Sequence, residues 1–244
     1  MESLYMFSAG SANDHTHRHL WIKGASMFIP QLNQLLTHTD YEFNPVDVSH
    51  FLNDDTDALG EIFKQNGSDK ATKHNYHIVY SYVFSKLGRD SNIDLLEIGI
   101  GTNNPALVSS MGSDGRPGAS LYTFRDYLPN ANIRGGDVDK DILFESDRIT
   151  TSYVDQLDSS TFNAFTDKKY DVIIDDGLHS IGANFNTLLF GLNNLKDDGW
   201  LIIEDIVIPD NWRAIDFILR TNKQFTTYIV RTKCAYMYLV KKNK

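Results

Sequence analysis

Two short apolar stretches that each end in a pair of acidic residues constrain this sequence more than any other feature. Residues Tyr170–Ser180 read YDVIIDDGLHS, and residues Trp200–Ile206 read WLIIEDI. Short runs rich in β-branched residues and bounded by polar residues are typical of strands that are covered on both faces. We therefore expect an open α/β sheet in which both strands deliver acidic side chains to the same edge.

The carboxylates at these strand ends predict a metal site. Ligands in open α/β sheets bind at the carboxyl ends of the strands, and adjacent parallel strands would bring Asp176, Glu204 and Asp205 together. Three carboxylates at close range require a cation or shifted pKa values, and a hard divalent cation with oxygen ligands is the simplest resolution. His179 follows in the same stretch. The alternative is a helix N-cap or a solvated rim, and it applies most to Asp175.

Length and composition place the chain in a broad class. Its 244 residues suit one sizeable domain, or one domain with an extension. The net charge of -9 argues against a nucleic-acid partner, and the single cysteine, Cys234, excludes an intramolecular disulfide. We see neither an apolar run long enough to span a bilayer nor the pattern of a secretory signal. We expect a cytoplasmic protein without a membrane partner.

The N-terminal part is the hardest to interpret. We expect an extension over residues 1–55 that packs on the core or on another subunit and is partly flexible, followed by the main domain over residues 56–244. His15, His17 and His19 would share one face of a strand, so a metal site is one interpretation. A polar segment is the other interpretation, because no carboxylate or cysteine cluster accompanies these histidines.

A polar turn precedes the first predicted strand of the main domain. Asp69, Lys70 and His74 have no evident packing role, so we expect this turn to close over a cofactor or an acceptor. The helix that follows carries Tyr76 and Tyr80. We assign Tyr80 to amphipathic packing, because it fits the apolar side of that helix.

Glycines follow the first predicted strand, residues 93–100. Gly99 and Gly101 permit a tight turn and a close backbone approach to a ligand. A dinucleotide fingerprint would require a third glycine where Asn104 stands, so a nicotinamide cofactor is disfavoured. The polar, glycine-rich loop over residues 109–121 either lines a ligand site or is plain surface.

The rest of the chain alternates strands and helices. Strands are predicted at 133–139 and 148–153, and a helix at 181–195 whose apolar face contains Phe185, Leu188, Leu189 and Leu192. Two last strands, at 226–230 and 236–240, suit an antiparallel hairpin. Asp137 or Asp139, at the end of the second strand, is placed to accept hydrogen bonds from ribose hydroxyls.

The order of these motifs resembles the class I methyltransferase family. Within that family it is similar to the metal-dependent sugar O-methyltransferases of the macrocin and mycinamicin type. The most specific motifs are IDDGLHS at 174–180 and IIEDI at 202–206, at this spacing. The others, in the family's order, are SDK at 68–70, LEIGIGT at 96–102, PGASL at 117–121, GGDVD at 135–139 and VDQ at 154–156.

This resemblance implies a fold and a set of site residues. The fold would be Rossmann-like α/β: a mostly parallel seven-stranded sheet with helices on both faces, a C-terminal antiparallel hairpin and an N-terminal extension. His179 would be the general base, with Asp176 beside it. Mg²⁺ would be held by Asp176, Glu204 and Asp205. The residues that would bind S-adenosylmethionine are Lys70, Glu97, Gly99, Gly101, Asp137, Asp155, Gln156 and Asp175.

The implied function is Mg²⁺-dependent transfer of a methyl group from S-adenosylmethionine to a sugar hydroxyl. The acceptor would be a small glycoside, a nucleotide sugar or a glycosylated natural product, and the enzyme a homo-oligomer. A metal that binds two vicinal oxygens would orient the diol and lower the hydroxyl pKa. The alternatives are O-methylation of a phenol or another non-sugar molecule, and a non-catalytic cofactor-binding protein.

Overall fold

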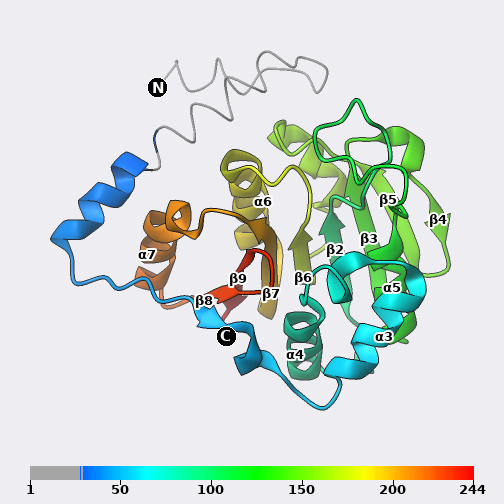
Figure 1. The fold of residues 1–244 in the computed structure, drawn as a ribbon, viewed down its shortest axis with the longest axis horizontal. Helices are drawn as coiled ribbons and strands as arrows, with labels where there is room; N and C mark the ends of the chain where they lie inside the picture. Colours follow the sequence, from blue (N-terminus) through cyan, green and yellow to red (C-terminus); the bar gives the residue numbers. More distant parts are fainter. Residues whose placement is uncertain (1–27, 29) are drawn as a thin grey trace.

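A single mixed sheet with helices on both faces organises the chain (Figure 1). The computed structural model describes residue 28 and residues 30–244, so the predicted histidine cluster at positions 15, 17 and 19 lies outside the described residues. Nine strands of the described part follow the order β1-β8-β9-β7-β6-β2-β3-β5-β4. Within this part, no helix is both long enough and apolar enough to cross a membrane.

The sheet is parallel at its centre and antiparallel at one side. Strands β2, β3, β5, β6 and β7 pair in parallel, whereas β9 runs antiparallel to both β7 and β8. The strands are β1 (Val46–Asp47), β2 (Asp94–Ile98), β3 (Asn132–Asp137), β4 (Glu145–Ser146), β5 (Ile149–Tyr153), β6 (Tyr170–Asp175), β7 (Leu195–Ile206), β8 (Phe225–Arg231) and β9 (Tyr236–Lys242). The predicted fold class is confirmed. The two strands that were not predicted, β1 and β4, are too short to carry a periodic pattern.

Helices cover both faces of this sheet. Figure 1 shows α3, α4 and α5 on one side of the strands and α6 and α7 on the other. The helices are α3 (Thr56–Asn66), α4 (His77–Leu87), α5 (Ala119–Tyr127), α6 (Ile181–Asn194) and α7 (Arg213–Thr221). Short 3₁₀ segments connect them: η1 (Leu36–His38), η2 (Val48–Phe51), η3 (Asp69–Ala71), η4 (Lys140–Ile142), η5 (Ser159–Phe165) and η6 (Pro209–Trp212).

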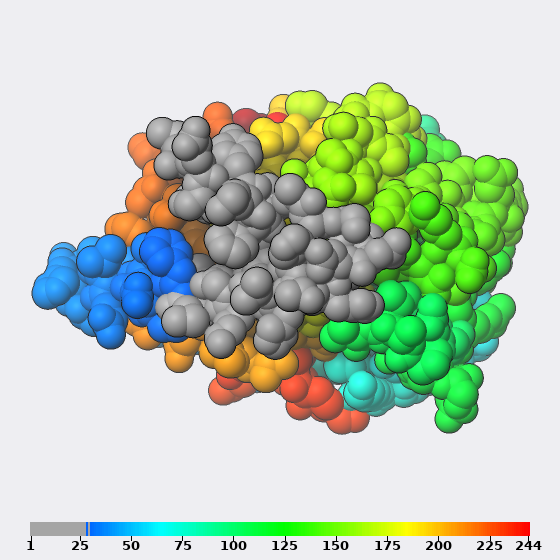
Figure 2. All heavy atoms as spheres, turned by 90° about the horizontal axis from the view of Figure 1, so that it is seen from above, coloured from blue at the N-terminus to red at the C-terminus, as the bar shows by residue number. Residues whose placement is uncertain are grey.

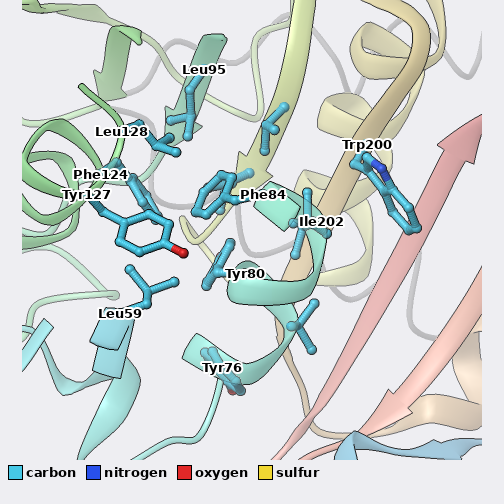
Figure 3. Close-up of a cluster of buried hydrophobic side chains, with 14 of the residues drawn as sticks. Leu59, Tyr76, Tyr80, Phe84, Leu95, Phe124, Tyr127, Leu128, Trp200 and Ile202 are labelled. Atoms are coloured by element: carbon cyan, nitrogen blue, oxygen red, sulfur yellow. The ribbon is translucent and has the colours of Figure 1, made fainter. Parts of the chain in front are cut away.

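The alternation of side chains along β2 divides the core into two layers. Leu95 packs with the aromatic side chains of α4 and α5, and Leu96 packs in the cluster on the other face. Figure 3 shows the first layer, in which Tyr80 and Phe84 lie beside Phe124. Each fully buried side chain of this size contributes roughly 1.5–3 kcal/mol relative to exposure. The sheet is therefore held rigidly beneath the residues at its edge.

The orientation of α6 differs from the prediction. Phe185 and Leu189 are 40% and 46% exposed, whereas Leu188 is buried. Gly191 faces the sheet instead, and a Cβ added there would lie 3.0 Å from Leu201. A side chain at position 191 would crowd Leu201 of β7, whereas Leu188 and Phe190 pack in the same core layer as Leu201.

Residues 46–51 are built into the sheet and its core. Strand β1 pairs in parallel with β8, and Val48 and Phe51 are buried in the first layer. In Figure 2, residues 30–40 (blue) lie at one end of the molecule and the green segments between residues 100 and 150 at the other. That the predicted extension contacts another subunit stays a prediction.

Candidate active site

A pocket lies at the carboxyl ends of β2, β3, β5 and β6. The predicted residues on its wall are Gly99, Gly101, Asp137, Asp155 and Gln156, together with Asp176. Strand β2 is flanked by β3 on one side and β6 on the other, so the chain changes direction across the sheet here. Open α/β sheets bind their ligands at such a switch point.

Gly99 lets two strand ends touch at the floor of this pocket. Its φ is 86°, in the left-handed region. A Cβ added there would come well inside 3.0 Å of the backbone of Asp176 and Gly177. Gly101 has nearly the same φ, 85°, but an added Cβ would meet only the flexible end of Met111, at 2.5 Å. Gly99 thus positions Asp176, a role that the sequence pattern did not reveal.

The two candidate ribose carboxylates have different environments. Asp137 lines the pocket and accepts hydrogen bonds from the backbone N–H groups of Ile100 (3.0 Å) and Asp139 (2.9 Å). Burial raises the pKa of Asp137. Asp139 instead accepts from the Thr102 hydroxyl at 2.5 Å and caps η4 through the N–H of Asp141. Asp137 therefore lines the pocket, whereas the carboxylate of Asp139 is held by Thr102 and η4.

Asp175 lies behind the pocket wall, not on it. Its carboxylate is fully buried and accepts from the side-chain amides of Gln156 (2.7 Å) and Asn184 (3.1 Å). Burial raises the pKa of Asp175. Gln156 also accepts from the N–H of Leu178 at 2.7 Å, so the pair braces the segment after β6.

Lys70 inserts into the acidic cluster from η3. Its Nζ lies 2.6 Å from Asp176 Oδ2, 2.5 Å from Glu204 Oε2 and 3.5 Å from Glu97 Oε1. Tyr80 donates a further hydrogen bond to Glu204. The predicted packing role of Tyr80 was therefore incomplete, because its hydroxyl reaches the site from within the aromatic core.

Burial and charge shift the pKa values in this cluster. Burial raises the pKa of Glu97 to about 7, and burial together with the Asp176 carboxylate raises that of Glu204 well above its usual range. Although burial opposes it, the Lys70 ammonium lowers the pKa of Asp176. Three carboxylates, those of Glu97, Asp176 and Glu204, pair with one ammonium, so the cluster has more acidic groups than Lys70 can neutralise.

The outer side of the cluster offers donor atoms for a metal. Asp176, His179 and Asp205 each contribute a ligand atom, and these atoms lie within 4.8 Å of one another. His179 Nε2 is 3.9 Å from Asp176 Oδ1 and 3.7 Å from Asp205 Oδ2. Both His179 and Asp205 have a φ of 53°, a strained conformation for non-glycine residues. This donor set fits a divalent cation. Glu204 lies deeper, on Lys70 and Tyr80.

Two residues of the turn before α4, His74 and Tyr76, lie beside the carboxylate of Asp205. Tyr76 donates to Asp205 Oδ1 at 2.5 Å, and His74 stacks on Tyr76 with ring centroids 4.5 Å apart. His74 Nδ1, which has no hydrogen-bond partner, is 3.8 Å from Asp205 Oδ1. Asp69 stays largely exposed, at 60% of its side chain. Lys70 and His74 thus lie beside the carboxylates at the strand ends, and Asp69 lies at the rim. That this turn closes over a cofactor or an acceptor stays a prediction.

Comparisons with known proteins identify the fold. No family model matches the chain. Over 155 residues it is 31% identical to the 8-demethyl-8-(2-methoxy-alpha-L-rhamnosyl)-tetracenomycin-C 3'-O-methyltransferase of Streptomyces olivaceus; the match covers 61% of this chain and 36% of the relative. The chain therefore spans about a third of that curated relative.

Solved structures of the methyltransferase MycE from the mycinamycin biosynthetic pathway are also similar. The complex with Mg and SAH superposes with a TM-score of 0.61 at 20% identity, covering 76% of this chain and 55% of MycE. The complex that also contains mycinamycin VI has a TM-score of 0.62 at 18% identity, with 76% and 54% covered. The chain thus has the class I methyltransferase fold, and the resemblance predicted from its motifs is confirmed for the fold.

Proposed function

We propose that this protein is an S-adenosylmethionine-dependent O-methyltransferase that uses Mg²⁺ to activate a hydroxyl group of a glycosylated small molecule. One observation supports the proposal: Asp176 lines the pocket and is also one of the two carboxylates, with Asp205, that can hold a metal ion. A cofactor in the pocket and an ion on Asp176 and Asp205 would therefore be neighbours. That adjacency is what a metal-assisted group transfer requires.

The pocket residues suit the parts of the cofactor in order along the sheet edge. Gly99 and Gly101 leave the backbone open for the methionine part, with Glu97 and Lys70 behind it. Asp137 faces the pocket with a carboxylate that can accept from the ribose hydroxyls. Asp155 and Gln156, at the end of β5, are assigned to the adenine side, and Asp175 holds Gln156 in place.

The proposed reaction forms a bond between the acceptor oxygen and the methyl carbon and breaks the bond between that carbon and the sulfonium sulfur. A bound Mg²⁺ would supply a Lewis acid that lowers the pKa of the acceptor hydroxyl. His179 Nε2 faces the same space as the two carboxylate oxygens, so it accepts the hydroxyl proton. The sulfonium leaves as a neutral thioether, and the positive charge is then on His179.

The sugar acceptor is supported by what the relatives' names say. The curated relative is a 3'-O-methyltransferase of a rhamnosyl tetracenomycin, and one MycE complex contains mycinamycin VI. Neither relative is spanned fully by this chain. The acceptor class and a homo-oligomeric state are therefore proposals that need direct measurement.

The first test addresses the cofactor. Calorimetric titration should give micromolar binding of S-adenosylhomocysteine and no binding of NAD. Tight NAD binding, or no response to S-adenosylhomocysteine, contradicts the assignment of the pocket.

The second test addresses the reaction. Glycosides and phenols are screened with methyl-labelled S-adenosylmethionine, with Mg²⁺ and after treatment with a chelator. Label transfer to a glycoside only when Mg²⁺ is present supports the proposal. Label transfer to phenols alone would contradict the glycoside acceptor. Full label transfer in chelator-treated protein would contradict a role for Mg²⁺ in the reaction.

A further inference from the structure

Lys70 pairs with Asp176, one of the two carboxylates to which the proposed function assigns the ion, and with Glu204, which lies deeper. We propose that Lys70 and the divalent ion are alternative cations for Asp176, and that Lys70 thereby sets the metal affinity of the site. This inference rests on the proposed function, because it requires a divalent ion at Asp176.

The contacts show that Lys70 is the internal counter-ion of this pair. Its ammonium is within 2.6 Å of an oxygen of Asp176 and 2.5 Å of an oxygen of Glu204. Lys70 and Glu204 are 3% and 1% exposed, so water cannot replace either partner. In the described part of the chain, Lys70 is the lysine or arginine that forms salt bridges with these two carboxylates. Glu204 is buried and Asp176 is half-buried, so this carboxylate pair would be unfavourable without such a cation.

A divalent ion bound to Asp176 would be repelled by the Lys70 ammonium. Both cations are attracted by the Asp176 carboxylate, and they repel each other at the short separation that a shared carboxylate imposes. A lysine ammonium is a point charge on a flexible four-carbon stem, so it can move without any change in the backbone. The lower-energy arrangement with the ion present is therefore one in which the ammonium moves away from Asp176.

Glu97 provides the place to which Lys70 can move. Its Oε1 atom is buried, has no hydrogen-bond partner and lies 3.5 Å from Lys70 Nζ. Its other oxygen accepts from Ser120 at 2.5 Å, which keeps the carboxylate in position. A shift of Lys70 toward Oε1 would exchange the Asp176 carboxylate for that of Glu97, so the ammonium stays neutralised while the ion takes its place on Asp176.

The direct test compares Lys70→Met with Lys196→Met. Lys196 is a matched control because it is also ion-paired, with Asp94 and Asp171, at the opposite end of β7. Mn²⁺ affinity is measured by electron paramagnetic resonance, and folding by circular dichroism. We expect Lys70→Met to bind Mn²⁺ at least about tenfold more tightly, because a repelling charge is removed, and Lys196→Met to match the wild type. Unchanged or weaker binding in folded Lys70→Met overturns the inference.

A second measurement uses the wild-type chain, because Lys70→Met leaves buried carboxylates unpaired and can fail to fold without metal. With ¹⁵N-labelled lysine, the Lys70 ammonium signal is followed while Mg²⁺ is added. We expect it to shift and to saturate with the ion, while the Lys196 signal stays in place. A Lys70 signal that does not respond to saturating Mg²⁺ overturns the exchange.

These outcomes separate this inference from the proposed function. Wild-type protein that binds no Mn²⁺ refutes the ion in the proposed mechanism, and the exchange falls with it. Wild-type protein that binds Mn²⁺, with Lys70→Met no tighter, refutes the exchange alone.

Discussion

Replacing Gly99 and Gly101 in turn by alanine should separate backbone strain from a steric clash. The two glycines have almost the same φ, 86° and 85°, so both variants should lose about 1–2 kcal/mol for a left-handed alanine. Gly101→Ala has little further cost, because the end of Met111 can move aside. Gly99→Ala brings a methyl group against the backbone of Asp176, where β2 and β6 cannot separate without disrupting the core. We expect a total loss of more than about 4 kcal/mol, or failure to fold.

Urea unfolding followed by circular dichroism measures both losses. If Gly99→Ala folds, the displaced Asp176 should also weaken Mn²⁺ binding, whereas Gly101→Ala should leave it unchanged. Equal losses of unfolding free energy in the two variants would falsify the claim that contact between the strand ends is what requires glycine at position 99.

Three further variants test the chemistry and the charges of the site. His179→Ala should lower turnover by about 10²–10⁴-fold with Mn²⁺ still bound; a loss of Mn²⁺ affinity would make His179 a ligand instead. Asp176→Asn should weaken Mn²⁺ binding at least about tenfold and leave S-adenosylhomocysteine affinity nearly intact, because Gly99, Gly101 and Asp137 still line the pocket; equal loss of both would contradict the assignment of Asp176 chiefly to the ion. The pKa of Glu97 is raised from 4.5 to about 7, so the folded state holds an extra proton in that interval. Stability of the metal-free protein should therefore fall by roughly 3 kcal/mol as pH rises across it. Urea titrations of Glu97→Gln should lack this decline.

The fold could be predicted where the signal is local. Strand β6 was predicted from one apolar run and β7 from another; β6 ends at Asp175, directly before Asp176, and Glu204 and Asp205 lie just before the last residue of β7. The face of α6 could not be predicted in the same way. Apolar periodicity favoured Phe185 and Leu189, but these side chains are exposed, and the close approach to Leu201 of β7 is made at Gly191. Periodicity reports which residues are apolar, not how closely the neighbouring element approaches.

The candidate site shows the same division between local and distant information. The excess of carboxylates at the strand ends was evident in the sequence, and it predicted either a cation or shifted pKa values. The identity of that cation depends on contacts between residues 106 and 134 positions apart, those of Lys70 with Asp176 and Glu204. Both outcomes that the sequence left open are seen here: the Lys70 ammonium neutralises part of the charge, and the pKa values of Glu97 and Glu204 are raised. That a divalent ion also binds stays a prediction. The role of Lys70 as a counter-ion could not be predicted from the sequence, because Lys70 is distant from both carboxylates along the chain.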